Sequence, residues 1–455
     1  MSLQSINPAN GQVIQSYTAM SDAEVDAIID EVSRAGNGWR NTDFSIRADL
    51  LKNAAKVLRS RKAELSRLMV AEMGKTYTSA EGEVDKCAWV CDFYAEHGEE
   101  FLAPEPISSD ASLSKIVYNP LGTVLAVMPW NFPFWQVFRF AAPGLMAGNT
   151  GLLKHASNVS GCALAIEEIF AEAGFPNSVF RTLLISSDKV ERVIENPAVA
   201  AVTLTGSTPA GRAVAGKAGQ CLKKTVLELG GSDPYLVLAD ADMALAVETC
   251  VNSRLINAGQ SCIAAKRFIV VQECVDEFTQ RFTELMASKK MGEPSDPDSD
   301  LGPQAREDLR DDLHKQVTKS VAKGAKLLLG GEIPDGPGAF YPPTVLGDVT
   351  AGMPAYDDEL FGPVAAIITA TDEADAIRIA NDSNFGLGAA VFTRDTERGE
   401  FIAAEQLQAG ACFVNSLVKS DPRLPFGGIK NSGYGRELSH LGIREFVNTK
   451  TVYVA

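Results

Sequence analysis

Short apolar runs that alternate with amphipathic helical patterns constrain the fold of this chain more than any other feature. Helical patterns such as Val159–Ala173 and Pro209–Ala218 separate several of these runs. The first series of runs comprises Thr123–Met128, Gly151–Lys154, Val179–Leu184, Ala200–Leu204, Val226–Leu229 and Tyr235–Leu238. Strands and helices that alternate in this way form βαβ units, whose parallel sheet is buried on both faces. The pattern therefore predicts an α/β fold.

A second series of apolar runs follows the first without a long linker. Its members are Phe268–Val271, Ala365–Ile368, Ala389–Phe392 and Ala411–Val414, and helical patterns again lie between them. A chain of 455 residues has room for about two to four domains. We therefore expect two doubly wound α/β units packed together, with a ligand site in the crevice between them.

The region before the first series is expected to be helical and then to change to β structure. Ser21 and Glu24 have the spacing of a capping box, which predicts the start of a helix. Farther along, Lys115–Tyr118 and Thr123–Met128 flank the turn-forming sequence Asn119-Pro120-Leu121-Gly122. This arrangement predicts a β-hairpin.

The charge and the cysteine content exclude several classes of protein. The 42 Lys and Arg residues are outnumbered by 58 Asp and Glu residues, which gives a formal net charge of −16 at pH 7. Such an acidic surface would repel a phosphate backbone, so nucleic acid is not an expected partner. The eight cysteines are too sparse for a disulfide scaffold and form no CxxC pair. With only four histidines to assist them, no metal site is expected.

The sequence also lacks the marks of export and of membrane insertion. The N-terminal segment has no basic stretch followed by an apolar one. No apolar stretch reaches the roughly 18 residues that a membrane helix needs. We therefore expect a soluble cytoplasmic protein with no membrane partner.

Cys262 is the thiol whose surroundings best suit a nucleophile. It follows the sequence Asn257-Ala258-Gly259-Gln260-Ser261, whose small residues leave room for a substrate carbonyl to approach. The alternative is a buried structural cysteine, which is the usual state of a free thiol. The histidines lie in no evident catalytic motif, so the sequence gives a Cys–His hydrolase no support.

Glu228 interrupts an apolar strand and is followed closely by Gly230 and Gly231. A carboxylate at the buried end of a strand is desolvated, which raises its pKa toward the range that suits a general base. The alternative is a glutamate on an edge strand that pairs with Lys223 or Lys224.

Two further turns at strand ends have the form of ligand sites. The segment Leu204–Arg212 passes from a strand through Gly206 and Ser207 into a helix, whose N-terminus would present free N–H groups to a pyrophosphate. Asn131, in the sequence Pro-Trp-Asn-Phe-Pro, follows another strand and can donate its amide N–H to an oxyanion. The alternative for Asn131 is an ordinary turn asparagine.

These segments, taken in this order, resemble the aldehyde dehydrogenase superfamily over essentially the whole chain. Further matching segments are Glu359-Leu-Phe-Gly-Pro363, Asn384-Phe-Gly-Leu387 and Pro425-Phe-Gly-Gly428, the last of which continues to Glu437. Within the superfamily, the short chain and the segment Val418-Lys-Ser-Asp-Pro-Arg423 are most similar to the short bacterial succinate-semialdehyde dehydrogenases.

The resemblance implies the oxidation of an aldehyde with NAD(P) and assigns catalytic roles to residues of this chain. Cys262 would attack the aldehyde, and Asn131 with the backbone N–H of Cys262 would hold the oxyanion. Glu228 would activate the water that hydrolyses the resulting thioester. Lys154, counted with the catalytic residues, would bind the adenosine ribose, and Glu359 the nicotinamide ribose. The remaining cofactor contacts implied are Trp130, His155, Ala156, Gly206, Ser207, Leu229 and Phe361.

The same resemblance divides the chain into three parts. Residues 1–114 and 128–233 would form a Rossmann-like cofactor-binding domain, and residues 234–435 the catalytic domain. Residues 115–127 and 436–455 would form a small β arm for oligomerisation. The C-terminal strand of that arm would pair with a neighbouring subunit, which implies a homodimer or homotetramer.

One position departs from the commonest pattern of the superfamily. Many NAD-dependent relatives have a glutamate three residues after the ribose-binding lysine, where this chain has Ser157 after Lys154. A neutral Ser157 removes repulsion against a 2′-phosphate, and Lys154 adds attraction. We therefore expect NADP or NAD as the cofactor: NADP is accepted and is the candidate for the preferred one.

The aromatic segment after Asn131 is expected to bind the far end of the substrate. Trp135 and Arg139 are four residues apart and share one face of a helix. A guanidinium on an apolar face needs an anion, which a substrate carboxylate would supply. The alternative is that Arg139 pairs with a carboxylate of the protein. Ser261 and Ser420 are expected to complete this substrate site.

The leading interpretation is the oxidation of succinate semialdehyde to succinate with reduction of NAD(P), a step of GABA degradation. The alternative within the enzymes is another small aliphatic or amino aldehyde. A binding protein that has lost turnover is disfavoured by the intact Cys262, Glu228 and Asn131. The presence of Glu228 also disfavours CoA-acylating relatives.

Overall fold

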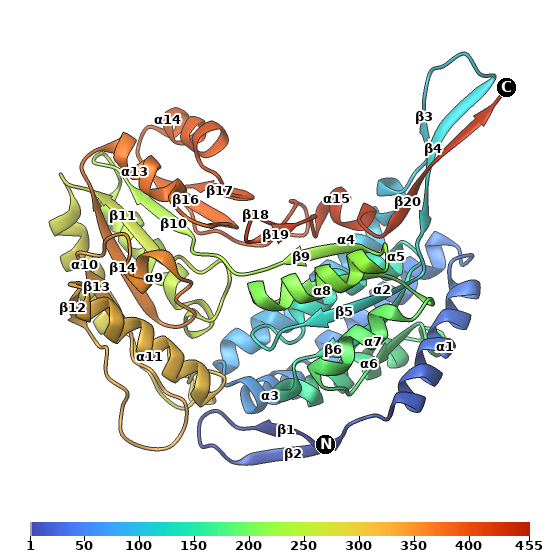
Figure 1. Cartoon of the computed structure of the whole chain (residues 1–455), viewed down its shortest axis with the longest axis horizontal. Coiled ribbons are helices and arrows are strands. Elements are labelled where there is room, and N and C mark those ends of the chain that lie inside the picture. Colours follow the sequence, from blue (N-terminus) through green and yellow to red (C-terminus); the bar gives the residue numbers. More distant parts are fainter. Residues whose placement is uncertain (1) are drawn as a thin grey trace.

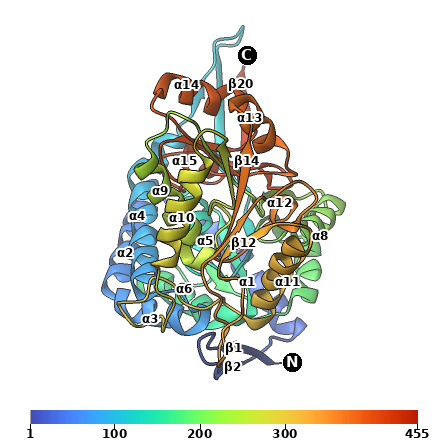
Figure 2. The same cartoon turned by 90° about the vertical axis from the view of Figure 1, so that its left-hand side faces the viewer.

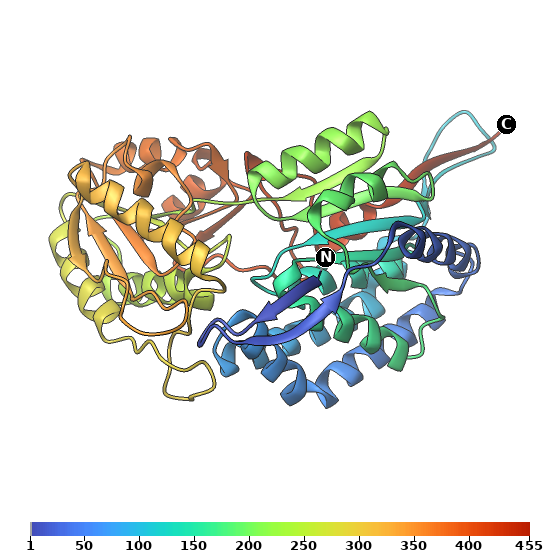
Figure 3. The ribbon, with the colours of Figure 1, turned by 60° about the horizontal axis from the view of Figure 1, so that its bottom comes forward.

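Two mainly parallel sheets, one in each lobe of the molecule, contain the apolar runs of the sequence. The computed structural model describes residues 2–455 and shows the two lobes side by side, with a narrow β arm at one end (Figure 1, Figure 3). The six-stranded sheet has the order β19-β9-β8-β5-β6-β7, and the seven-stranded sheet has the order β12-β13-β14-β11-β10-β16-β17. Within these two sheets, β19 and β12 run antiparallel to their neighbours. The predicted α/β fold with two units is therefore confirmed.

The first lobe combines residues from the N-terminal half of the chain with a segment near the C-terminus. Its sheet consists of β5 (Thr123–Met128), β6 (Thr150–His155), β7 (Phe180–Thr182), β8 (Val199–Thr205), β9 (Lys224–Glu228) and β19 (Gly433–Tyr434). Its helices are α1 (Asp22–Trp39), α2 (Phe44–Ser60), α3 (Lys62–Met73), α4 (Tyr77–Phe101), α5 (Trp135–Met146), η1 (Ser157–Val159), α6 (Ser160–Glu172), η2 (Ser187–Lys189), α7 (Val190–Glu195), α8 (Thr208–Gln220) and α15 (Ser439–Arg444). A ribbon of β1 (Ser2–Ile6) and β2 (Val13–Thr18) lies beside this lobe.

The second lobe is formed by the middle and later part of the chain. Its sheet consists of β10 (Pro234–Val237), β11 (Arg267–Val271), β12 (Lys326–Leu329), β13 (Thr344–Gly347), β14 (Val364–Ala370), β16 (Gly388–Phe392) and β17 (Ala411–Val414). Its helices are α9 (Met243–Leu255), η3 (Ile256–Gly259), α10 (Val275–Ala287), α11 (Glu307–Ala322), α12 (Pro354–Asp357), α13 (Glu373–Asn381), α14 (Thr396–Phe401) and η4 (Ile402–Gln406). β15 (Phe385–Gly386) and β18 (Ile429–Lys430) form a separate short pair.

Helices cover both faces of the six-stranded sheet because its strands are apolar on both sides. In β5, Val124, Ala126 and Met128 join a core formed with helices α2 to α6. The intervening Leu125 points to the other face, where it joins a core formed with α1, α7 and α8. β5 is therefore a central strand, and the loops at its carboxyl end are held by a sheet that is packed on both sides.

The β-hairpin expected between residues 115 and 128 is wrong. β4 (Leu113–Pro120) pairs antiparallel with β20 (Val447–Val454), whereas β5 pairs in parallel with β6 and β8. Gly122, with a φ of 128°, connects the two strands and redirects the chain from one sheet into the other. The physical reason is that β5 is apolar on both faces, so it gains more from burial in the middle of a sheet than from a two-stranded ribbon.

The arm is a three-stranded antiparallel sheet of order β20-β4-β3, in which β3 spans Glu105–Pro106. Figure 2 shows it projecting from the end of the molecule opposite the β1–β2 ribbon. Residues 123–127 of the expected arm belong instead to β5. Residues 436–455 were also expected in the arm, but α15, which lies within them, contacts α4 and α5 of the first lobe. Within residues 2–455, no helix has both the length and the apolar character that crossing a bilayer requires.

Candidate active site

The predicted site residues meet where strands of the first lobe end, opposite a loop of the second lobe. β5 ends directly before Trp130 and Asn131, and β9 ends at Glu228. The carboxyl ends of parallel strands lie at the same edge of a sheet, so these side chains come together. A cavity of about 260 Å³ at this edge is lined by Trp130, Asn131, Gly206, Ser207, Glu228, Leu229, Cys262, Glu359 and Phe361.

The loop that carries Cys262 is held in a strained backbone conformation. Asn257 and Ala258 have φ values of 54° and 53°, and Gly259 follows with a φ of 76°. Non-glycine residues seldom adopt this left-handed region, and such strain persists only where the surroundings fix it. At Gly259 a Cβ atom would lie 2.1 Å from the carbonyl oxygen of Gly362. Close packing of two backbones thus fixes the approach to the thiol.

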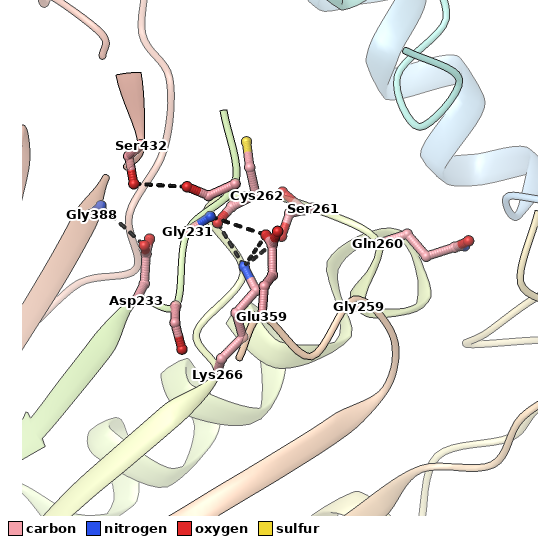
Figure 4. A network of polar contacts seen from close by, with 12 residues as sticks. Gly231, Asp233, Gly259, Gln260, Ser261, Cys262, Lys266, Glu359, Gly388 and Ser432 are labelled. Carbon is pink, nitrogen blue, oxygen red and sulfur yellow. Dashed lines mark hydrogen bonds and ion pairs between the residues drawn. The ribbon is translucent and has the colours of Figure 1, made fainter. Parts of the chain in front are cut away.

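Lys266, at the start of β11, ties this loop to the opposite wall (Figure 4). Its buried ammonium donates to the carbonyl oxygens of Ser261, at 3.0 Å, and Cys262, at 2.6 Å. It also lies 3.4 Å from the carboxylate of Glu359, which accepts a hydrogen bond from the backbone N–H of Gly231. The Cys262 side chain points away from the ammonium, so Lys266 positions the nucleophile through its backbone.

The Cys262 thiol is half-buried, and burial raises its pKa to about 12. The charges of Arg139 and Lys266 lower this pKa, whereas Glu359 and Asp233 raise it. The resting thiol is therefore protonated near neutral pH and needs a base before it can attack a carbonyl.

Asn131 is buried and turned toward the nucleophile loop. Its amide Nδ2 donates to the carbonyl of Gln260 at 3.1 Å, which leaves its second N–H without a partner among the described residues. Asn257 in turn donates to the backbone carbonyl of Asn131 at 2.7 Å. This arrangement fits an amide that donates to an oxyanion on the carbon attached to Cys262.

Glu228 is buried and has no hydrogen-bond partner for either carboxylate oxygen within residues 2–455. Burial, with a smaller contribution from Glu437, raises its pKa well above the ordinary value. The alternative of a pair with a neighbouring lysine is wrong, because Lys223 donates to backbone carbonyls and Lys224 pairs with Glu445. β9 is flanked by β8 and β19, so Glu228 is not on an edge strand either.

Lys154 is the predicted cofactor-binding residue whose side chain most clearly lacks a partner within the protein. It is buried at the end of β6, and burial lowers its pKa. Its ammonium has no hydrogen-bond or ion-pair partner in the part of the chain that the structure describes. A buried cation without a partner fits a ribose or phosphate ligand. Ser157 is exposed nearby and lines a separate hollow of about 460 Å³ beside β1.

His155, a predicted cofactor contact, has a structural role in this fold. Its Nε2 lies 2.8 Å from the carbonyl of Pro133, while its Nδ1 accepts from the backbone N–H of Ala156 at 3.0 Å. Burial lowers the pKa of His155 to about 4, so the ring is neutral. It therefore clamps the turn that carries Asn131. Ala156 participates through its backbone, which links β6 to β5 at Met128.

The cavity of about 260 Å³, where the nicotinamide is expected, has an aromatic wall and the N-terminus of a helix. Trp130 and Phe361 are in edge-to-face contact with ring centroids 5.7 Å apart. Ser207 caps α8, and its hydroxyl accepts from the backbone N–H of Ala210. Leu229 packs closely on Gly211: a Cβ atom at Gly211 would lie 2.6 Å from the side chain of Leu229. These features fit a dinucleotide that passes α8 on its way to Cys262.

A second cavity, of about 210 Å³, opens on the other side of Cys262. It is lined by all four predicted substrate residues, Trp135, Arg139, Ser261 and Ser420. Cys262 and Gln136 line both cavities, so the thiol stands at their junction. The structure thus brings together residues from α5, from the nucleophile loop and from the segment after β17.

The anion that Arg139 needs is provided by the protein. Its buried guanidinium forms an ion pair with Glu437, donates to Thr205 at 3.3 Å and lies over the ring of Phe426. Of the two anions considered for Arg139, a substrate carboxylate or a protein carboxylate, the structure shows the protein carboxylate. Glu437 is 298 residues away along the chain, and the sequence around Arg139 carries no signal of it.

Sequence reasoning missed several residues that shape the site. Lys266 has a weak signal, because a lysine just before an apolar strand is unusual. Glu83 of α4 accepts from the backbone N–H groups of Phe134 and Trp135 and pairs with the buried Lys75. Lys86 lies one helical turn farther along and faces the second cavity. All of these belong to segments without a recognisable motif.

Comparisons with known proteins agree with this geometry. The model of the aldehyde dehydrogenase family matches residues 1–452. A probable succinate-semialdehyde dehydrogenase [NADP(+)] of Synechocystis is 51% identical over the full length of both chains. Succinate-semialdehyde dehydrogenase [NADP(+)] 1 of Mycobacterium tuberculosis is 50% identical, again over both full lengths.

Solved structures show the same fold with different substrates. The succinic semialdehyde dehydrogenase of Streptococcus pyogenes, solved with NADP+, is 40% identical, covers 99% of both chains and has a TM-score of 0.97. The lactaldehyde dehydrogenase of Escherichia coli is 32% identical and has a TM-score of 0.96, over 100% of this chain and 96% of its own. Because proteins with different substrates superpose this closely, the fold alone does not set the substrate.

Replacing Lys266 with methionine is expected to slow the alkylation of Cys262 by iodoacetamide about tenfold at pH 8, because loss of a nearby positive charge raises the pKa of the thiol. The rate is measured by mass spectrometry of the peptide that contains Cys262. Lys326→Met, which removes an exposed lysine of the same lobe, is the control and should leave the rate unchanged. Equal rates in wild type and Lys266→Met would show that Lys266 does not act on the thiol.

Proposed function

The chain belongs to the aldehyde dehydrogenase family, and we propose that it oxidises succinate semialdehyde to succinate with NADP+ as the electron acceptor. The single observation that carries the proposal is the position of Cys262 at the junction of two cavities. One cavity contains the residues that fit a nicotinamide cofactor, and the other contains apolar walls with cationic and hydroxyl groups. The named activity of two relatives at about 50% identity supports this substrate and this cofactor.

The reaction begins at Cys262, whose thiol proton passes to Glu228. The buried, unpartnered carboxylate of Glu228 has a raised pKa, so it holds a proton more strongly than an exposed glutamate does. Sulfur then forms a bond to the aldehyde carbon, and the free N–H of Asn131 with the backbone N–H of Cys262 stabilises the resulting oxyanion. Lys266 keeps the loop in place while charge develops.

When bound, NADP+ supplies the acceptor for the hydride that leaves the substrate carbon. The aldehyde carbon is thereby oxidised and remains attached to Cys262 as a thioester. Lys154 and Glu359 would hold the two riboses, and the rings of Trp130 and Phe361, which are in contact, would line the nicotinamide end. In this assignment the first lobe binds the cofactor.

Hydrolysis completes the cycle. Glu228 first releases the thiol proton to solvent and then removes a proton from a water molecule, which attacks the thioester carbon while Asn131 again stabilises the oxyanion. The carbon–sulfur bond breaks, succinate is released, and the Cys262 thiolate takes back a proton from Glu228. A carboxylate that is buried but has no protein partner is suited to this exchange, because neither charge state is locked by an ion pair.

The proposal includes a homodimer or homotetramer formed through the arm. β20 is the outer strand of the order β20-β4-β3, so one of its edges is unpaired within residues 2–455. Leu113, Tyr453 and Val454 expose apolar side chains on the same arm. An unpaired edge with apolar neighbours favours contact with a second chain. A cytoplasmic location is also proposed, since all eight cysteines are free thiols.

The substrate is tested by measuring NADPH formation with succinate semialdehyde, butanal and lactaldehyde. We expect kcat/KM for succinate semialdehyde to exceed that for butanal at least about 100-fold, because butanal has the same carbon chain and lacks the carboxylate. A preference for butanal or for lactaldehyde would contradict the proposed substrate and leave the family assignment intact.

Glu228→Gln is expected to release about one NADPH per active site in a burst and then turn over at least about 100-fold more slowly than wild type, because hydrolysis of the thioester is lost. Rapid mixing with succinate semialdehyde measures both phases. Cys262→Ala is the matched control, which should bind NADP+ normally and show no burst. If Glu228→Gln turns over at the wild-type rate, Glu228 is not the base.

Ser157→Glu is expected to shift cofactor preference toward NAD+. The new carboxylate would repel a 2′-phosphate and could accept hydrogen bonds from the hydroxyls of an unphosphorylated ribose. The penalty against NADP+ should be about 1–3 kcal/mol, because the site is exposed and partly screened. The ratio of kcat/KM for NADP+ and NAD+ measures it, with Ser157→Ala as the neutral control. An unchanged ratio would contradict the placement of the 2′-phosphate.

A further inference from the structure

The cavity on the substrate side of Cys262 contains a lysine that no carboxylate neutralises. Lys86, on α4, lines this cavity together with Cys262. Its ammonium donates to the hydroxyl of Ser420 at 2.7 Å and lies 4.3 Å from the centre of the Trp135 ring. Among the described residues, no carboxylate oxygen lies within 4.0 Å of it. Both contacts hold the ammonium in place without cancelling its charge.

The charged groups nearest to Lys86 are already paired with other partners. Glu83 pairs with Lys75 and accepts two backbone N–H groups at the start of α5. Asp421 binds Arg423 through both of its oxygens.

Arg139, a second cation of the cavity, is paired with the buried Glu437. Lys419 also lines the cavity, but it is exposed and its charge is screened by solvent. Lys86 is therefore the half-buried cation of this cavity whose charge remains uncompensated.

The cavity that contains Cys262 and Lys86 also has apolar walls. Phe132, Ile256, Ile263, Leu417 and Phe426 line the same cavity as Cys262 and Lys86. A substrate with an aldehyde at one end, a short methylene chain and a carboxylate at the other end matches a cavity that combines a thiol, apolar walls and a cation. Ser420 accepts from Lys86, so its own O–H is free to donate to a carboxylate oxygen.

We propose that Lys86 is the residue that selects for a carboxylate at the far end of the substrate, with Ser420 as its partner. The inference rests on the proposed function, because it names the group that recognises succinate semialdehyde in the same cavity. Arg139 then shapes the cavity through its pair with Glu437, and Lys86 supplies the charge. Lys86 does not touch the reacting carbon, so it determines specificity and not the chemical step.

The test compares Lys86→Met with Lys86→Arg on two aldehydes. Lys86→Met should lower kcat/KM for succinate semialdehyde at least about 30-fold, mainly through KM, and change that for butanal less than about threefold. Lys86→Arg keeps the positive charge and should retain most of the preference. Activity on butanal also shows that each variant is folded. Lys419→Met removes a charge from the exposed rim of the same cavity and should have a much smaller effect.

Inhibition by succinate provides a second readout. With butanal as the substrate, succinate should inhibit the wild-type enzyme and Lys86→Arg, and inhibit Lys86→Met at least about 30-fold less strongly. This measurement does not depend on turnover of the semialdehyde.

The pH dependence provides a third readout that a merely structural role would not change. Burial lowers the pKa of Lys86 to about 8; Arg139 lowers it further, whereas Cys87, Glu83 and Asp421 raise it. The ammonium is lost as the pH rises through this value, so the wild-type preference for the semialdehyde over butanal should fall between pH 7 and 9.5. In Lys86→Arg the preference should stay constant, because a guanidinium remains charged.

The outcomes distinguish a wrong substrate from a wrong role for Lys86. If the wild-type enzyme does not prefer succinate semialdehyde over butanal, the proposed function is wrong. If it does and Lys86→Met keeps the preference and the inhibition by succinate, the inference about Lys86 alone is wrong. Equal losses on both aldehydes, or equal effects of Lys86→Met and Lys419→Met, would also overturn the inference.

Discussion

A parallel sheet that is covered by helices on both faces leaves its polar side chains one place to meet, the edge at which the strands end. β5, β6, β8 and β9 all deliver a site residue or a site loop to this edge. The second lobe faces it with the strained loop of Cys262, which backbone contact at Gly259 and the ammonium of Lys266 hold in place. The geometry of the site therefore follows from the packing of the first sheet and the tethering of a single loop.

Ion pairing divides the charged residues of the crevice into two groups. Lys75 with Glu83, and Arg139 with Glu437, are satisfied within the protein and act as parts of its framework. Lys154, Glu228 and Lys86 have no ion-pair partner within residues 2–455. Glu228 and Lys86 also line cavities. Burying an unpaired charge is costly, so such groups are expected where a ligand, a water molecule or a transferred proton completes them.

The chemistry and the substrate are set by different parts of the site. In the proposed mechanism, Cys262, Asn131 and Glu228 form the part that oxidises an aldehyde. The cavity beyond Cys262 determines which aldehyde enters, and its side chains come from α4, α5 and the segment after β17. This separation explains how a lactaldehyde dehydrogenase and a succinic semialdehyde dehydrogenase share one fold with this chain.

The α/β class, the pair of sheets and the nucleophile, base and oxyanion candidates could be predicted from the sequence, because periodic apolar patterns and short motifs are local signals. The ribose-binding candidates came from the resemblance to the family. Tertiary structure decided what depends on distant contacts. The strand after Gly122 entered the sheet and not a hairpin, since both of its faces could be buried. Arg139 met Glu437 and His155 met Pro133, so both side chains have partners that their local sequence does not reveal. Lys266 and Lys86 gained their roles only when segments without any motif folded against the loop and the cavity, because the burial and charge of a side chain depend on neighbours that the local sequence does not contain.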